Sequence, residues 1–216
     1  TGEIMVKHHD HNHPTEPDAD NFIPTDGEIW EATLRDLLIT KGVITPSMMR
    51  QQMDQTASQS ASVGAEIIAR AWTNPLFKDA LLKNPKEALS ESGYDLSGVP
   101  DLCIVENQSD IHNVVVCTLC SCYPRFMLGP PPEWYKSAAF RSRIVDEPKD
   151  VLLEFGLDLN ETTKIRVYDS TADIRYMVMP MRPVGTAHMS VDELKPLITR
   201  DTMIGVAQPE LPVNGS

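Results

Sequence analysis

Three of the chain's four cysteines lie within six residues, at Cys117, Cys120 and Cys122. Three sulfurs this close in sequence can face one point only if the backbone between them curls tightly. The peptide nitrogens of Ser121 and Cys122 then lie beside the sulfurs. Residues 117–122, named the claw here, can therefore offer a metal three thiolates and, if two amides lose their protons, two nitrogens. Such a donor set suits a trivalent, strong-field ion better than zinc, which usually takes four side-chain ligands in a tetrahedron.

Other roles for the cysteines fit less well. A zinc or iron–sulfur site needs a fourth ligand, and the remaining cysteine, Cys103, lies in an apolar strand-like run that suits a buried core thiol. A disulfide between Cys120 and Cys122 would be strained, and we identify no secretory signal that would place the chain in an oxidising compartment. We therefore expect a metal site rather than a structural or redox role.

Length, composition and net charge limit the classes of protein to which the chain can belong. The chain has 216 residues, of which 41% are hydrophobic, and a formal net charge of −12. This length allows one domain with an appendage or two small domains. The negative charge argues against nucleic acid and anionic membranes as partners, and no apolar stretch approaches a membrane span. A soluble, cytoplasmic protein is the expectation.

Residues 1–25 are polar and contain four of the six histidines, at His8, His9, His11 and His13. This composition predicts a disordered arm, with loose metal binding for delivery as the alternative.

Residues 26–100 have a helical pattern. An apolar stripe from Ile29 to Leu38 predicts a helix that stops by Gly42. Further helix starts are marked by a capping residue followed by proline, at Thr45-Pro46, Asn74-Pro75 and Asn84-Pro85.

Residues 101–216 form the predicted metal-binding α/β domain. Strands are expected at 102–106 and 113–116, and the second runs directly into Cys117, so a sheet would hold the claw rigidly. Residues 164–169 and 174–179 alternate in polarity and are interpreted as strands that pair with each other across a short turn. Helices are predicted over residues 137–145, after Pro148 and after a capping box that begins at Ser190.

The run from Val114 to Pro124 closely resembles the metal-binding segment of the nitrile hydratase alpha subunit family. Other blocks resemble that family in the same order, at residues 69–75, 131–137, 165–170, 182–186 and 199–207. The resemblance covers roughly residues 28–210. It implies an α+β fold in which an N-terminal helical arm precedes a layered α-β-β-α domain that carries the claw.

The resemblance also implies the contents of the site. A cobalt(III) or iron(III) ion would be bound by the sulfurs of Cys117, Cys120 and Cys122 and the backbone nitrogens of Ser121 and Cys122. Cys120 would be a sulfinate and Cys122 a sulfenate. These anionic groups need positive partners, which in the family are arginines of a beta-type subunit. The chain alone should therefore hold an incomplete site, and a metal-loading activator, if one is used, is a further partner.

The implied activity is the hydration of small nitriles to amides. A trivalent ion with one open position acts as a Lewis acid that polarises the C≡N bond or lowers the pKa of bound water. The Cys122 sulfenate oxygen is then a nucleophile or a base that activates water. Ser121 either positions a water through its hydroxyl or shapes the claw through its N–H group.

Two residues near the claw bear on substrate and metal. Arg125 stands where members of the family usually carry tryptophan, and the gamma subunit of the related thiocyanate hydrolase is similar in carrying arginine there. Arg125 could bind an anionic substrate such as thiocyanate through its positive charge. Alternatively, Arg125 pairs with an acidic residue at the subunit interface. Thr118 resembles cobalt-type members, while iron-type members generally have serine. Nitrile hydration at cobalt is the first expectation, with thiocyanate hydrolysis and iron as alternatives.

The segment after the claw is rich in proline, aromatic and arginine residues, which are typical of an obligate interface. We expect a beta-type subunit to cover the claw at Pro130–Pro132, Trp134, Tyr135, Arg141 and Arg143.

Overall fold

The computed structural model describes residues 26–49 and 61–211. Contacts divide the chain into two compact units, one ending at Gln51 and the other beginning at Gln52. The expected His-rich arm, residues 1–25, lies outside the described residues. The predicted domain boundary at residue 100 stays a prediction.

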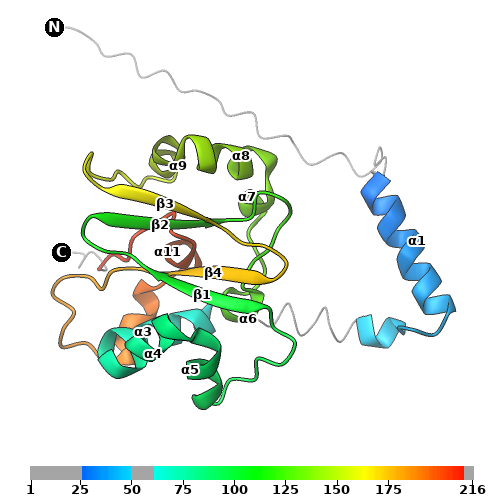
Figure 1. Cartoon of the computed structure of the whole chain (residues 1–216), viewed down its shortest axis with the longest axis horizontal. Coiled ribbons are helices and arrows are strands. Elements are labelled where there is room, and N and C mark those ends of the chain that lie inside the picture. The colour runs from blue at the N-terminus through cyan, green and yellow to red at the C-terminus, as the bar shows by residue number, and fades with distance from the viewer. Residues whose placement is uncertain (1–25, 50–60, 212–216) are drawn as a thin grey trace, which may run out of the picture. The chain divides into compact units, whose positions relative to one another are not determined.

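The first unit contains helix α1, Asp26–Thr40, drawn in blue in Figure 1. An i,i+4 ion pair joins Arg35 to Glu31 along its surface, at 3.2 Å. The helix has ended before Gly42, whose φ of 69° suits glycine. A second helical stretch begins at residue 46, and its cap is Thr45, whose Oγ1 accepts a hydrogen bond from the Met48 backbone N at 3.1 Å. Both predicted boundaries are confirmed.

Three helices open the second unit: α3, Ser62–Thr73, α4, Pro75–Lys83, and α5, Pro85–Glu91. The predicted Asn-Pro starts are confirmed at both α4 and α5. The Asn74 side chain accepts from the Phe77 backbone N, and the Asn84 side chain accepts from the Glu87 backbone N. A proline follows each cap because the first helical position needs no N–H donor.

Four strands form the centre of the second unit: β1, Asp101–Glu106, β2, Ile111–Val116, β3, Lys164–Asp169, and β4, Ile174–Met179. Strand β1 pairs with β4, and β2 pairs with β3, in both cases parallel. The four strands were therefore located correctly. The expectation that β3 and β4 pair with each other was wrong.

The short connection between β3 and β4 explains the difference. Backbone N of Ser170 donates to Val116 O at 2.7 Å, which extends the β2–β3 ladder. At the other end of the connection, Asp173 O accepts from Asp101 N at 2.8 Å, which extends the β1–β4 ladder. The connection is thus divided between two sheets. An alternating pattern identifies a strand but does not identify its partner.

The remaining helices follow the claw and the last strand. They are α6, Arg125–Leu128, α7, Glu133–Lys136, α8, Ala138–Asp146, α9, Pro148–Glu154, α10, Val191–Leu194, a 3-10 turn over Lys195–Leu197, and α11, Arg200–Ile204. The predicted capping box at Ser190 is confirmed, since its side chain accepts from Glu193 N and the Glu193 carboxylate accepts from Ser190 N.

Helices flank the strands on two sides (Figure 1). Helices α4 and α5 pack on β1, α9 packs on β3, and α11 contacts both β2 and β4. One core of buried apolar side chains joins these layers, including Ile68, Leu81, Val114, Met177 and Met203. The fold is α+β with the layered arrangement expected for the claw domain. None of the helices in the described parts of the chain is long and apolar enough to cross a membrane.

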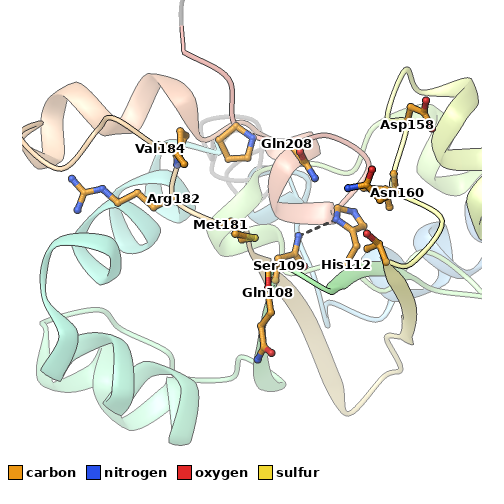
Figure 2. Close-up of a pocket in the computed structure, with 14 residues that line it drawn as sticks. Gln108, Ser109, His112, Asp158, Asn160, Met181, Arg182, Val184 and Gln208 are labelled. Carbon is orange, nitrogen blue, oxygen red and sulfur yellow. Dashed lines mark hydrogen bonds between the residues drawn. The ribbon is translucent and has the colours of Figure 1, made fainter.

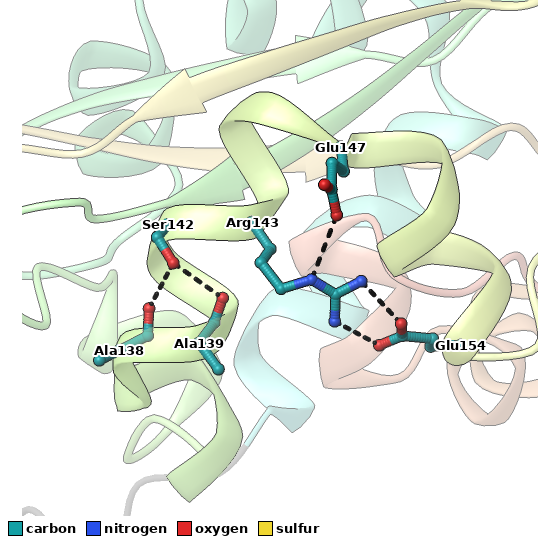
Figure 3. Close-up of polar contacts among 6 residues, drawn as sticks. All are labelled: Ala138, Ala139, Ser142, Arg143, Glu147 and Glu154. Atoms are coloured by element: carbon teal, nitrogen blue, oxygen red, sulfur yellow. Dashed lines mark hydrogen bonds and ion pairs between the residues drawn. The ribbon is translucent and has the colours of Figure 1, made fainter.

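An arginine ties α8 to α9 (Figure 3). The two Nη atoms of Arg143 donate to the Glu154 carboxylate at 3.0 and 2.7 Å, and its Nε donates to Glu147 at 3.4 Å. The fork geometry of guanidinium fits such a two-point contact. These acids raise the pKa of Arg143, mainly through the hydrogen bonds to Glu154. The Arg143 side chain thus pairs with acids of its own chain and ties α9 to α8, the helix whose Arg141 contacts the claw.

Candidate metal centre

The claw begins where β2 ends. Val116 is the last residue of β2, and Cys117 follows it directly. The side chains of Val114, Val116 and Cys117 are fully buried, so the packed sheet fixes the position of the first sulfur. The second end of the claw is fixed by α6, which starts three residues after Cys122 at Arg125.

The structure brings the three predicted sulfurs together. All three Sγ atoms lie within 4.8 Å of one another. The Cys120 Sγ lies 3.5 Å from that of Cys117 and 3.3 Å from that of Cys122. Cys117 and Cys122 are buried, whereas Cys120 is exposed. Among the residues that the structure describes, no histidine or carboxylate joins this cluster.

Strand β3 holds the claw through Asp169, which lies opposite Val116 in the ladder. The Asp169 carboxylate accepts hydrogen bonds from the backbone N of Thr118 at 3.0 Å and from its Oγ1 at 2.5 Å. These contacts fix the first turn after Cys117.

Helices α7 and α8 hold the other parts of the claw. Arg141 Nη1 donates to the carbonyl oxygens of Leu119, at 3.1 Å, and Thr118, at 3.4 Å. Tyr135 Oη donates to the carbonyl oxygen of Cys122 at 2.9 Å. Tyr135 is fully buried and lies 5.1 Å from the ring of Tyr123 in an edge-on contact. The expectation that Tyr135 faces a partner is therefore wrong, because its ring and hydroxyl serve the interior of this chain.

The thiols of Cys120 and Cys122 differ in the direction in which their pKa values are shifted. Hydrogen bonds from the Cys122 and Cys117 thiols lower the pKa of the exposed Cys120 thiol. Burial is the main reason that the pKa of Cys122 is raised to about 12, and the charge of Arg175 opposes that rise. Burial therefore favours the neutral form of the Cys122 thiol.

The claw opens into a cavity of about 560 Å³. Cys120, Ser121 and Cys122 line it together with two arginines, Arg125 from the start of α6 and Arg175 from β4. No acidic side chain is among the described residues that line this cavity. Ser121 and Arg125 thus lie beside the sulfurs as expected, but their roles in chemistry stay predictions.

The donor set fits a trivalent metal ion. Three soft sulfurs converge without a fourth side-chain ligand in the described residues, which disfavours a tetrahedral zinc site. The peptide nitrogens of the claw are the nearest further donors by connectivity, and they require a strongly polarising ion. Thiolates of neighbouring cysteines repel one another because each carries a negative charge, and a bound cation would offset this repulsion.

A second cavity, of about 300 Å³, lies at the start of β2 rather than its end (Figure 2). His112 lines it, but both ring nitrogens are engaged. Nε2 lies 2.7 Å from Gly205 O and Nδ1 lies 3.2 Å from the Asn107 Nδ2, so Nε2 carries the proton and Nδ1 accepts. Burial lowers the pKa of His112. This histidine is a buried neutral link between strand and helix, not a candidate ligand.

Sequence reasoning missed the side chains that support the claw. Asp169 and Arg175 were identified only as parts of two strands, and Arg141 and Tyr135 only as contacts for the partner subunit. The expected pairing of β3 with β4 concealed Asp169. When β3 is paired with β2, the ends of both strands lie side by side, and the acidic residue at the end of β3 becomes a candidate contact for the claw.

The comparison with known proteins agrees with this geometry. A family model for the nitrile hydratase alpha chain matches residues 25–207. The chain is 42% identical to the nitrile hydratase subunit alpha of a Rhodococcus species, over 89% of this chain and 98% of the relative. It is 42% identical to the cobalt-containing nitrile hydratase subunit alpha of Pseudonocardia thermophila, over 80% and 86%. It is also 39% identical to the thiocyanate hydrolase subunit gamma of Thiobacillus thioparus, over 86% and 81%.

Solved structures give the same result. A recombinant thiocyanate hydrolase with partially modified cobalt centres matches with a TM-score of 0.79 and 38% identity, over 88% of this chain and 93% of the other. A double mutant of the Fe-type nitrile hydratase from Comamonas testosteroni Ni1 matches with a TM-score of 0.78 and 39% identity, over 87% and 94%. The chain therefore belongs to the nitrile hydratase alpha-chain family, a family of enzyme subunits.

Proposed function

We propose that this chain is the metal-bearing catalytic subunit of a nitrile hydratase, which converts small nitriles to amides together with a beta-type subunit. The observation that carries the proposal is the cluster of three sulfurs within 4.8 Å, two of which, those of Cys120 and Cys122, belong to residues that line a cavity of about 560 Å³. A cavity of this size holds a small molecule. Membership of the family supports the same activity.

The metal would be held by the sulfurs of Cys117, Cys120 and Cys122 and the backbone nitrogens of Ser121 and Cys122. Cobalt(III) is the proposed ion, supported by Thr118 in the claw and by the relative named as cobalt-containing. Iron(III) is the alternative, supported by the similar Fe-type structure. Such an ion supplies Lewis acidity that polarises a carbon–nitrogen triple bond. Cys120 as a sulfinate and Cys122 as a sulfenate complete the proposed site.

The residues of the chain have separate proposed roles. The oxygen on Cys122 attacks the nitrile carbon or takes a proton from an attacking water. Ser121 is half-buried on the cavity wall, where its hydroxyl can position that water. In the net reaction the oxygen of water bonds to the nitrile carbon and its hydrogens pass to nitrogen, which gives the amide.

Thiocyanate hydrolysis to carbonyl sulfide and ammonia is the second candidate. The observation that favours it is Arg125, whose exposed side chain lines the same cavity as Cys120 and Cys122. A permanent cation there would attract an anion, and the similar thiocyanate hydrolase subunit is consistent with this alternative.

Parallel assays separate the two candidates. The purified complex would be given acrylonitrile, benzonitrile and thiocyanate, with amide, carbonyl sulfide and ammonia measured. Turnover of nitriles is the expected result, and turnover of thiocyanate alone would replace the first candidate with the second. In Arg125→Trp, thiocyanate binding should weaken far more than nitrile binding if Arg125 meets the anion. Arg166→Trp, on the exposed side of β3 and away from the cavity lining, is the matched control.

The proposal includes the partner. The claw cavity is open, and Cys120 and Leu119 beside it are exposed, with Leu119 at 88%. A beta-type subunit that supplies arginines would cover this surface. Expressed alone, the chain should be inactive or poorly soluble. Full turnover by a soluble monomer would contradict this part of the proposal.

A further inference from the structure

The claw cavity is a cationic site on an acidic protein. The whole chain has a formal net charge of −12, yet Arg125 and Arg175 are the charged side chains among the described residues that line this cavity, apart from the sulfurs. Two guanidinium groups with no acid beside them on the cavity wall favour an anion. Arg125 is exposed at the start of α6, whereas Arg175 is half-buried in β4, so we expect each arginine to bind a different anion.

Arg175 is built into the sheet. It is the second residue of β4 and lies opposite Leu102 of β1 in the parallel ladder. Its side chain is half-buried, and its Nη1 atom is fully buried without a hydrogen-bond partner. A buried guanidinium N–H without an acceptor costs the full desolvation of that group. The exposed Arg125, at the start of α6, carries no such cost.

The unpartnered donor shares the cavity wall with Cys120 and Cys122. Cys122 is buried, as is the Arg175 Nη1 atom, whereas Cys120 is exposed and its acceptors can be reached by water. The missing acceptor is therefore expected on Cys122. A bare sulfur is a weak acceptor, but a sulfur that carries an oxygen is a strong one.

We propose that Arg175 is a positioning residue whose Nη1 donates a hydrogen bond to the oxygen carried by Cys122. This inference rests on the proposed function, because it requires the sulfenate at Cys122. It adds a counter-charge from this chain to the arginines expected from the partner subunit. The bond would orient the oxygen and withdraw electron density from it, which makes the sulfenate less reactive toward oxidants.

The test measures how fast the Cys122 sulfenate is oxidised further. The complex with its partner subunit would be purified as wild type, Arg175→Gln and Arg175→Lys, and treated with hydrogen peroxide. In this step one oxygen passes from peroxide to sulfur, the peroxide O–O bond breaks and water leaves. The sulfinate at Cys122 is then quantified by mass spectrometry of the claw peptide.

Loss of a charge-assisted hydrogen bond should accelerate this oxidation by about tenfold in Arg175→Gln. Arg175→Lys keeps the charge and should restore most of the protection, which a merely structural role for Arg175 does not predict. Arg166→Gln, an exposed arginine on β3, should leave the rate at the wild-type value. Circular dichroism of each variant establishes that the fold is intact, and Arg175→Met, which also removes the guanidinium donors, replaces Arg175→Gln if that variant fails to fold.

Two failures can be told apart. If the wild-type claw peptide carries added oxygens and Arg175→Gln is oxidised at the wild-type rate, the role of Arg175 is overturned and the proposed function stands. If the wild-type peptide carries no added oxygen, the proposed oxidised site is itself overturned.

Discussion

The carboxylate of Asp169 accepts two hydrogen bonds from Thr118, one from the backbone N at 3.0 Å and one from Oγ1 at 2.5 Å. Asp169 ends β3, and Thr118 is the second residue of the claw. The contact therefore fixes the claw to the end of a strand that is distant in sequence, since Asp169 lies 51 residues after Thr118.

Replacing Asp169 by asparagine should reduce metal retention. The amide oxygen can still accept from the Thr118 N–H and the NH2 group can donate to Thr118 Oγ1, but both bonds lose the strengthening charge of the carboxylate. Residues that orient metal ligands typically contribute about 10- to 100-fold to metal affinity. Metal content per chain after dialysis against a chelator measures the effect. Asp173→Asn, in the turn before β4, is the control, and equal metal loss in both variants would contradict the role of Asp169.

Gly205→Ala should destabilise the fold strongly. Gly205 ends α11 with a φ of 96°, and a Cβ there would lie 2.1 Å from the backbone oxygen of Asn113 in β2. Gly156 has a similar φ of 84° with nothing within 4 Å of its Cβ position, so Gly156→Ala isolates the conformational cost of about 1–2 kcal/mol. The thermal midpoint of the complex should fall much further for Gly205→Ala. Equal shifts would show that the close approach to β2 is unimportant.

Acid should weaken the link between β2 and α11. Burial lowers the pKa of His112 below its ordinary 6.5, so the unfolded chain binds a proton that the folded chain resists. The stability that His112 contributes is complete above pH 6.5 and is lost as the pH falls toward the folded-state pKa. Thermal midpoints over a pH range that spans 6.5 should show a slope that His112→Gln reduces. His188→Gln, at an exposed position, should keep the slope; a slope unchanged in His112→Gln would refute the link.

Local signals in the sequence predicted much of the fold because their physical causes are local. The Asn74-Pro75 and Asn84-Pro85 helix starts depend on a side chain that caps its own helix, and the three sulfurs that converge belong to residues only two and three positions apart. Family resemblance added the layered arrangement.

Contacts between distant parts of the chain could not be predicted from such local signals. Parallel pairing of β2 with β3 depends on how the chain between them packs, and it alone brings Asp169 to Thr118. Tyr135 was expected at the interface with the partner because aromatic and arginine residues follow the claw, yet its hydroxyl donates to the Cys122 carbonyl in the interior. The sequence of its own strand did not mark Arg175 as a site residue, because its proposed role depends on the cavity wall that it shares with Cys122.

The most direct test of the account combines elemental analysis of the purified complex with the intact mass of the claw peptide, residues 117–122 and their flanks. The account predicts one cobalt or iron ion per chain, two added oxygens on Cys120 and one on Cys122. Zinc in place of these ions, or a metal-free chain with three unmodified thiols, would contradict the central claim.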